Sequence, residues 1–502
     1  MFQFKTLAAV PALVFLMGGT AHAALTVDQV WQSWKESGAS VGLTVAAASE
    51  SNAGGVLTLT GVTIAPEGAP TPFTISDLTL TENSDGTVTI APGAAIGIEH
   101  ADGPNAAKVA VVHDGLVITA SEEAGTLTYE FEATSLNVDF DMASEGYSWD
   151  ETAPKPIVKT SGKVGFETLT GVYTDTPGTN RAFGLDVAAD KFILDTANDD
   201  PGMGVKSTST SETADLALGL DVTLPVSPFD QLQGPTGFRK ALEEGMALAA
   251  TFSQGESKGS SKDENEFMPM DMVMSALPSQ GTLSFDKSEF SLESKGGGAT
   301  ATLTSTAFPA PVEVSVGEVA LNMLVPVIAE TPADMALQMQ LNQLVLGDGL
   351  WGMFDPGMAL KRDPLDLNID LSGKTTMDMP GMIEAEETGA TPPVPAVENL
   401  DITDITLKVA GAALNATGAL TFDNSMGMPM PLGQAKVNVD GANALIDGLI
   451  KTGLLQEQDA MGARMMMGMF MKPSGNGDDS LTSDIEFKEG MQILVNGQPL
   501  PM

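Results

Sequence analysis

The sequence of 502 residues contains no cysteine at all. This absence excludes disulfides, thiolate nucleophiles and metal or iron–sulfur sites built on cysteine. Histidine is nearly as scarce, and only His100 and His113 lie beyond the N-terminal region. Neither belongs to an H-x-x-x-H or H-E-x-x-H pair, so the sequence does not support a zinc hydrolase.

Other catalytic signatures are also missing. There is no phosphate-binding P-loop of the form G-x-x-x-x-G-K-[ST]. The 20 Phe, 4 Trp and 3 Tyr are few for a sugar-binding cleft. We therefore predict no catalytic residue, no cofactor and no enzyme activity. Because 66 acidic residues always offer carboxylate pairs, an uncharacterised hydrolase stays open as a second alternative.

Basic residues are few: 24 stand against 66 acidic ones, for a net charge of −42. Such a surface repels nucleic acid and anionic membranes, and we expect neither as a partner. Because the acidic residues are scattered, we interpret them as a solvated surface rather than as a calcium site.

Long apolar runs are also absent after the N-terminus. Lys5 and the apolar run Leu7 to Met17 precede Ala21-His22-Ala23, the small-x-small pattern that signal peptidase cleaves. The sequence predicts a signal peptide over residues 1–23, cleavage after Ala23 and export to the periplasm of a Gram-negative bacterium. No later run is long enough to form a transmembrane span of the mature chain.

Alternation of apolar and polar residues dominates the rest of the chain. It is clearest at Leu127/Tyr129/Phe131, at Leu216 to Leu224 and at Met335 to Leu341. This pattern is typical of antiparallel sheet with one wet face. We predict a mainly β fold, an elongated, curved antiparallel sheet built from repeated strand–turn units.

A few short helices interrupt this pattern at the N-terminus, in the middle and near the C-terminus. The first is expected over residues 24–37, where Trp31 and Trp34 lie on one face. We interpret the two tryptophans as a lid that closes one end of a sheet rather than as a binding stripe. A second is expected over residues 236–246, and a helical pair at about 442–471.

The predicted organisation has two β-rich regions. Residues 24–253 form the first, residues 254–280 a flexible linker or loop rich in Gly, Ser, Lys and acid, and residues 281–502 the second. Residues 379–398, with four prolines, are expected to form another loop. The pattern G-x-L-[ST]-F-D-x-S occurs at residues 281–288 and again at residues 418–425, which indicates a repeated strand–turn unit.

Methionine is abundant, with 28 residues that cluster along the chain. Thioethers are the soft ligands that remain for Cu(I) when cysteine is absent, which makes periplasmic Cu(I) handling an alternative function. The candidate ligands are Met268, Met270, Met272, Met274, Met461 and Met465. The simpler interpretation is packing, because Met461, Met465 and Met469 share one helix face that would be buried in a core.

Two Asp-Pro dipeptides, at Asp355 and Asp363, bracket a loop that also contains Arg362. Arg362 could contact an anionic ligand on this loop. The simpler interpretation is a pair of turns in which Arg362 bridges to a carboxylate.

Several segments resemble an uncharacterised alphaproteobacterial family, domain of unknown function 2125. They are residues 350–357, 362–364, 370–373, 441–447, 453–455, 460–466 and 481–483. The resemblance runs from about Leu337 to Val495 and implies kinship and location, since the family has no assigned activity. The repeated G-x-L-x-F strands are also similar in pattern to AsmA-like envelope proteins, which are associated with lipid handling.

Together these features predict a non-enzymatic periplasmic envelope protein. Its curved sheet would present an apolar face to a lipid or other apolar ligand, or to another envelope protein as a scaffold.

Overall fold

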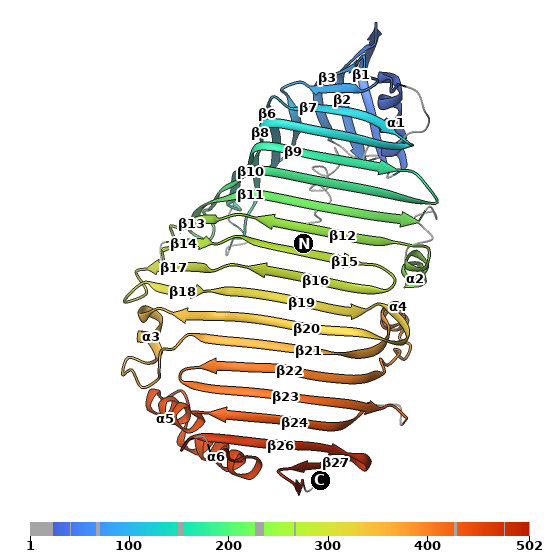
Figure 1. Ribbon diagram of the computed structural model, residues 1–502. Coiled ribbons are helices and arrows are strands. Elements are labelled where there is room, and N and C mark those ends of the chain that lie inside the picture. Colours follow the sequence, from blue (N-terminus) through green and yellow to red (C-terminus); the bar gives the residue numbers. More distant parts are fainter. Residues whose placement is uncertain are drawn as a thin grey trace. The chain divides into compact units, whose positions relative to one another are not determined.

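The computed structural model describes residues 24–40, 42–66, 71–148, 152, 154–225, 235–265, 268–425, 429–475 and 477–500. The predicted signal peptide and its cleavage site after Ala23 lie outside these residues. Strands make up 64% of the described residues and pair in antiparallel fashion, and the same residues include six short helices at the N-terminus, in the middle and in the C-terminal region (Figure 1). The predicted mainly β class is therefore confirmed.

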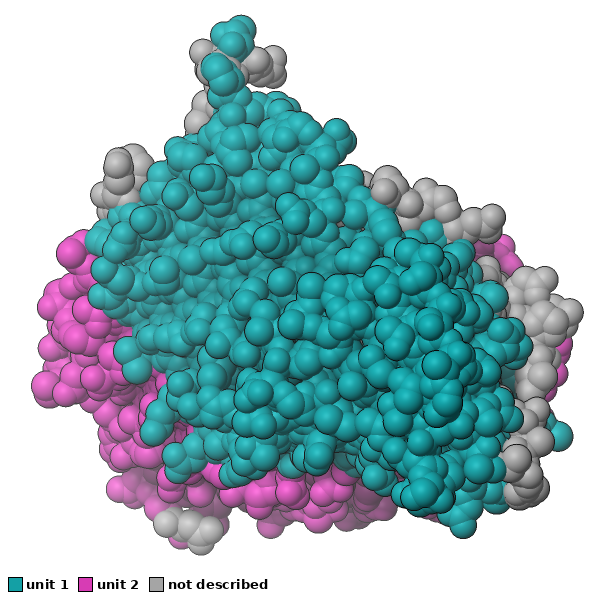
Figure 2. Space-filling view, turned by 90° about the horizontal axis from the view of Figure 1, so that it is seen from above, with its two compact units in different colours: residues 1–226, 249–273 teal, residues 227–248, 274–502 magenta. Residues whose placement is uncertain are grey.

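The chain divides into two compact units, which are coloured separately in Figure 2. Unit 1 comprises residues 1–226 and 249–273, and unit 2 comprises residues 227–248 and 274–502.

The described part of unit 1 contains one helix, α1 (Val27–Ser40), and a long antiparallel succession of strands. The strands are β1 (Leu43–Ala53), β2 (Val56–Pro66), β3 (Phe73–Glu82), β4 (Val88–Pro92), β5 (Ile96–Asp102), β6 (Asn105–Asp114), β7 (Val117–Glu123), β8 (Thr126–Glu145), β9 (Ile157–Thr176), β10 (Asn180–Asp200), β11 (Val205–Pro225), most of β12 (Ala247–Gln254), β13 (Ser257–Asp263) and the first part of β14 (Met270–Ala276).

The main hydrophobic core of unit 1 lies under α1. Val27, Val30, Trp31 and Trp34 recur at helical spacing, and all four are buried. They pack with buried side chains of β1–β5 and β7–β9, so the predicted packing of the two tryptophans against the sheet is confirmed. The indole Nε1 of Trp31 donates a hydrogen bond to Glu50 Oε1 at 2.8 Å, which satisfies the polar atom of this buried ring.

An ion pair lies at the edge of this core. Asp175 is only 1% exposed and receives two hydrogen bonds from Arg181, one from Nε at 2.9 Å and one from Nη2 at 2.5 Å. The neighbouring Tyr129 and Tyr173 rings are buried, and burial raises the pKa of Tyr129 to about 12. The surroundings therefore disfavour unpaired charge, and the guanidinium compensates the buried carboxylate.

Replacing Arg181 by methionine should leave Asp175 buried without a counter-charge. Because Arg181 is itself 31% exposed, we expect a loss of about 3 kcal/mol in the free energy of unfolding, at the lower end of the range for a broken buried pair. Urea unfolding followed by circular dichroism measures this loss. Arg181→Lys keeps the charge and should recover part of it, whereas an Arg181→Met variant as stable as the wild type would contradict the assignment.

Unit 2 consists of antiparallel strands with helices at both ends of them. The strands are β15 (Ser279–Phe285), β16 (Glu289–Gly296), β17 (Ala299–Ser305), β18 (Val312–Val316), β19 (Glu318–Pro326), β20 (Ile328–Leu346), β21 (Leu365–Asp378), β22 (Val397–Val409), β23 (Ala412–Asp423), β24 (Met430–Asp440), β25 (Lys472–Pro473), β26 (Ser480–Lys488), β27 (Gln492–Val495) and β28 (Gln498–Pro499). The helices are α2 (Pro235–Glu243), α3 (Asp348–Phe354), α4 (Met379–Thr388), α5 (Ala442–Thr452) and α6 (Glu457–Phe470), with a 3-10 turn at Glu489–Met491. In Figure 1, α2 and α4 lie at one end of these strands, and α3, α5 and α6 at the other.

The predicted flexible linker at residues 254–280 is wrong, because its described residues include β13, β14 and the start of β15. Ser257–Asp263 lacks apolar alternation, yet it forms a strand because it pairs with residues 207–213 of β11. The loop predicted at residues 379–398 is also partly wrong, because it begins with α4. Asp378 caps that helix by accepting a hydrogen bond from the Gly381 N–H, and Gly389 ends it in the left-handed conformation.

The repeated G-x-L-[ST]-F-D-x-S pattern has a structural role at its Asp-x-Ser end. Asp286 Oδ1 accepts hydrogen bonds from the N–H groups of Ser288 and Glu289 at 2.6 and 3.0 Å. Asp423 Oδ1 accepts from the Ser425 N–H at 2.9 Å, and this bonding lowers the pKa of Asp423. Both copies are therefore the end of a strand followed by a turn that an aspartate side chain fixes.

Candidate functional site

One face of the unit 2 sheet is apolar across ten strands. Residues that pair directly on antiparallel strands point to the same face, so the register defines which side chains share it. The central row of successive partners runs through β15, β16, β19–β24, β26 and β27. It consists of Leu283, Leu292, Met323, Leu337, Leu371, Ile402, Gly418, Ala435, Ile485 and Val495.

Two parallel rows widen this surface, which we call the apolar face. The first consists of Leu321, Met339, Ile369, Ile405, Ala416 and Val437. The second consists of Val319, Leu341, Leu367, Leu407, Leu414, Val439 and Leu481.

The apolar face has no second layer over it in the described part of unit 2. Except for Val495, which is buried, and Val319, which is 40% exposed, its residues are half-buried. Both hydrophobic core clusters of the described chain consist of unit 1 residues. A sheet normally buries its apolar face against another element. Unit 2 thus carries a broad apolar surface whose side chains are shielded mainly by one another.

The opposite face of the same strands is polar. Asn322 donates to Gln338 Oε1, and Gln338 in turn donates to Asp370, each at 3.2 Å. Further along, Asn368 donates to Asp404 Oδ2 at 2.5 Å. On this face, polar side chains of neighbouring strands thus satisfy one another's hydrogen-bonding groups. Only the apolar face is therefore suited to an apolar contact.

At one end of the strands, α2 borders the apolar face. Phe238 of α2 stacks on Phe285 with ring centroids 6.0 Å apart and an interplanar angle of 11°, and Phe285 contacts Phe290 at 6.5 Å. Arg239 of α2 pairs with Asp378 at 2.5 Å, and Asp378 also caps α4. One carboxylate thus joins the two helices at this border.

At the other end, α3 and the loop after it form a fixed corner. Arg362 pairs with Asp348 Oδ1 at 2.5 Å, and its guanidinium lies 5.6 Å from the centre of the Trp351 ring. The interpretation of Arg362 as a bridge to a carboxylate is confirmed. The pKa of Asp355 is lowered although desolvation opposes this, because the backbone N–H groups of Leu360 and Ala359 donate to its carboxylate.

The expected helical pair at about 442–471 corresponds to α5 and α6, and Asp479 caps the first of these two helices. The Gly441 N-cap of α5 offers no side-chain oxygen. Instead, Asp479 accepts hydrogen bonds from the N–H groups of Asn443 and Ala444 at 3.1 and 3.0 Å. Desolvation of Asp479 raises its pKa, but these N–H donors outweigh it and the pKa is lowered.

This capping predicts that the stability of unit 2 depends on pH. A carboxyl whose pKa is depressed in the folded state stabilises the fold above its unfolded pKa, and that stabilisation is lost as the pH falls through the folded value. The difference in melting temperature between the wild type and Asp479→Asn should therefore be constant near neutral pH and shrink below about pH 4. A difference that does not change with pH would contradict the capping role.

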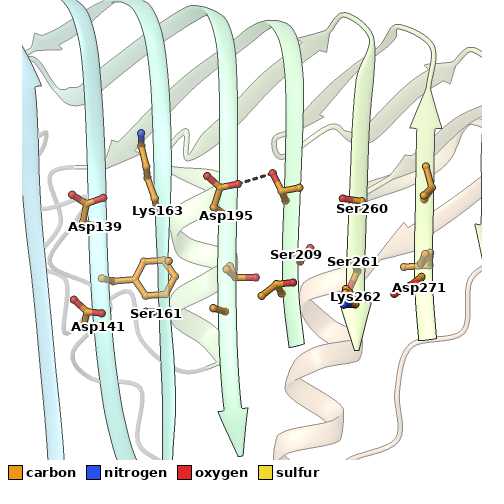
Figure 3. Close-up of a pocket in the computed structure, with 18 residues that line it drawn as sticks. Asp139, Asp141, Ser161, Lys163, Asp195, Ser209, Ser260, Ser261, Lys262 and Asp271 are labelled. Carbon is orange, nitrogen blue, oxygen red and sulfur yellow. Dashed lines mark hydrogen bonds between the residues drawn. The ribbon is translucent and has the colours of Figure 1, made fainter. Parts of the chain in front are cut away.

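Unit 1 contains a hollow of about 860 Å³ lined by residues of β8–β11, β13 and β14 (Figure 3). Asp139, Lys163 and Asp195 are successive cross-strand partners, and Asp195 Oδ1 accepts a hydrogen bond from Thr210 at 2.6 Å. Opposite charges in direct cross-strand positions stabilise a sheet. We therefore interpret these charges as sheet pairing.

The structure places the candidate Cu(I) ligands on two different elements. Met270, Met272 and Met274 alternate along β14 and Met268 precedes it, whereas Met461 and Met465 lie on α6. Met426 and Met428 lie outside the described residues. Copper binding stays a prediction, and titration with Cu(I) under reducing conditions tests it against the affinity of free methionine.

The packing interpretation of the α6 methionines is wrong. Met461, Met465 and Met469 are 70%, 66% and 64% exposed, and Met466 is 57% exposed. The helix instead buries Ala460. Helical spacing correctly grouped Met461, Met465 and Met469 on one face, but it gave no information on which face of α6 is covered.

The two histidines outside the N-terminal region have structural contacts. His100 Nδ1 lies 2.7 Å from Thr71 Oγ1, and His113 Nε2 lies 3.2 Å from the carbonyl oxygen of Gly93. Among the described residues, no group of three or more His, Cys, Asp or Glu side chains is placed to hold a metal ion. No helix in the described ranges is both long and apolar enough to cross a membrane.

The residues that build the apolar face lie within one family match. Residues 272–500 match a bacterial family model. The family is described as "Uncharacterized protein conserved in bacteria (DUF2125)". The DUF2125 match extends further upstream than Leu337, where the sequence resemblance began. It includes all three rows of the apolar face and the helices α3–α6. No curated protein matches the chain.

Proposed function

We propose that this protein binds a lipid or another elongated apolar ligand on the apolar face of unit 2. The observation that carries the proposal is the row from Leu283 to Val495, an apolar surface that continues through ten hydrogen-bonded strands without a covering layer. Each Å² of apolar surface removed from water contributes about 25 cal/mol, so a ligand lying along these rows gains affinity without any specific polar contact.

The chemistry of the face supports an apolar ligand more than a polar one. Its three rows contain Leu, Ile, Val, Met, Ala and Gly, with no charged side chain among them, although the whole chain has a net charge of −42. An acyl chain tolerates variation along such a surface, whereas a sugar or a nucleotide needs polar partners. The function proposed here is therefore binding, without catalysis.

The N-terminal pattern at residues 1–23 supports export, and we place this binding function in the periplasm. A scaffold role for another envelope protein would use the same face.

Lipid analysis tests the proposal. The protein purified without detergent should release lipid in a constant ratio to protein when it is extracted and analysed by mass spectrometry. After delipidation it should bind a fluorescent fatty acid at concentrations below micelle formation. A chain that carries no lipid and binds no fatty acid would overturn the proposal.

A further inference from the structure

Among the described residues of unit 2, the pair α5–α6 carries the most exposed group of large apolar side chains outside the sheet. Met461, Met465 and Met469 recur every four residues along α6, and Met466 lies beside them. Leu454, between the two helices, is 57% exposed. A helix that exposes an apolar stripe of this kind normally has a surface to contact.

The fold fixes the opposite side of α6, so the stripe is held outward. Arg464 Nη2 donates to Asp447 Oδ1 of α5 at 2.5 Å, and Arg464 Nε donates to Asn443 Oδ1 at 3.3 Å. At the end of the helix, the carbonyl oxygen of Phe470 accepts hydrogen bonds from Ser483 Oγ at 2.8 Å and from Asn496 Nδ2 at 2.9 Å. Rotation of α6 to bury its methionines would break these contacts.

The same contacts connect the stripe to the apolar face. Ser483 is the direct partner of Val437 on β24, and Val437 belongs to one row of the face. Because Ser483 donates to Phe470, α6 ends where β24 and β26 present the apolar face. The exposed methionines and the apolar face are thus neighbouring parts of unit 2.

Charge distinguishes this region from the rest of the chain. Residues 441–473 contain three acidic side chains, Asp447, Glu457 and Asp459, and three basic ones, Lys451, Arg464 and Lys472. The segment is therefore neutral in a chain of net charge −42, which places all of the excess negative charge elsewhere. Because anionic lipid surfaces repel a strongly acidic chain and a neutral surface does not attract it, the segment without excess negative charge is the part of this chain best suited to lie against a lipid surface.

We propose that α5–α6 docks unit 2 on the surface of an electrically neutral lipid bilayer, where the α6 methionines insert between the acyl chains. The inference rests on the proposed function, since docking at the bilayer would let lipid pass to and from the apolar face. Unbranched, flexible thioether side chains adapt to a fluid surface, and an amphipathic helix buries one face at the bilayer interface.

Flotation of the full chain with phosphatidylcholine vesicles tests the docking. The wild type should float with the vesicles, and Met461→Gln/Met465→Gln/Met469→Gln should reduce the bound fraction at least about tenfold. These side chains are largely exposed, so the fold should be unaffected. The matched control Met203→Gln/Met268→Gln/Met382→Gln changes three other exposed methionines and should float like the wild type.

The lipid headgroup gives a second readout. Phosphatidylglycerol vesicles should bind less protein than phosphatidylcholine vesicles at low salt, because the net charge of −42 is repelled. Added salt should reduce the difference in bound fraction between the two kinds of vesicle, because it screens the repulsion. Docking is overturned if the wild type does not float with neutral vesicles, if the α6 variant floats as well as the wild type, or if anionic vesicles bind more strongly. If the methionine stripe binds a partner protein instead, the wild type should not float with neutral vesicles.

Uptake of a fluorescent fatty acid from solution separates the two proposals. The α6 variant should keep equilibrium uptake, since its apolar face is intact, while losing flotation. A wild-type protein that floats with vesicles but takes up no fatty acid would overturn the proposed function alone. A wild-type protein that takes up fatty acid but does not float would overturn the docking alone.

Discussion

Replacing Trp31 by alanine is expected to lower the free energy of unfolding of unit 1 by about 3–5 kcal/mol. Trp31 is 2% exposed and forms an edge-to-face contact with Trp34, with ring centroids 6.3 Å apart. The substitution removes the ring from the main core cluster and leaves Glu50 without the indole N–H as its donor. Both losses fall at the contact between α1 and the sheet.

Urea unfolding followed by far-ultraviolet circular dichroism measures the effect of Trp31→Ala. The matched control is Val112→Ala, because Val112 is an exposed residue of β6 in the same unit, and its loss should be below about 1 kcal/mol. If Trp31→Ala unfolds at the same urea concentration as this control, then α1 is not part of the core that stabilises unit 1.

Replacing Met339 by aspartate is expected to reduce the affinity for a fatty acid at least about tenfold, because it places a charge in the middle of a surface that binds by apolar contact. Met339 lies on β20 between Leu321 and Ile369, its partners on the two neighbouring strands. It is half-buried, so water can reach the new carboxylate and the fold should persist.

The neighbouring residue provides the control for this prediction. Gln340 is exposed on the opposite face of β20, where it pairs with Ala320 and Asn368. Gln340→Asp introduces the same charge one residue away and should leave fatty-acid binding unchanged. Equal losses in both variants would mean that the effect is not specific to the apolar face. No loss in Met339→Asp would place the ligand elsewhere.

Much of the fold could be predicted because local patterns and long-range contacts agree. The spacing of Val27, Val30, Trp31 and Trp34 indicated both the first helix and the face that it buries. Strict alternation from Met335 to Leu341 indicated a strand in spite of residues that favour helix, and these residues lie in β20.

Where the patterns failed, the neighbouring strand decided the structure. Ser257–Asp263 has no apolar side chain to mark a strand, and it becomes β13 because β11 supplies hydrogen-bond partners along its length. Residues 254–280 therefore contain strands where composition indicated a linker. A local sequence pattern carries no information about a partner that lies more than forty residues away.

The sequence could predict that the sheet has an apolar face, but not how many strands that face spans. Alternation indicated one apolar face, but the registry that joins Leu283 to Val495 through eight intermediate residues depends on pairings that no single strand encodes. The α6 stripe was misread for a related reason. Both sides of that helix contain apolar residues, with Ala460 on the buried side and Met461 on the exposed one, so periodicity alone could not tell them apart.

Photo-crosslinking tests the central claim most directly. A fatty acid with a diazirine on its acyl chain is bound to the delipidated protein, irradiated and located by peptide mass spectrometry. The apolar face predicts crosslinks on peptides of β19–β23, at residues such as Met339, Ile369 and Ile405. Crosslinks confined to unit 1, or to the polar face at residues such as Gln338 and Asp370, would contradict the assignment of this face as the binding surface.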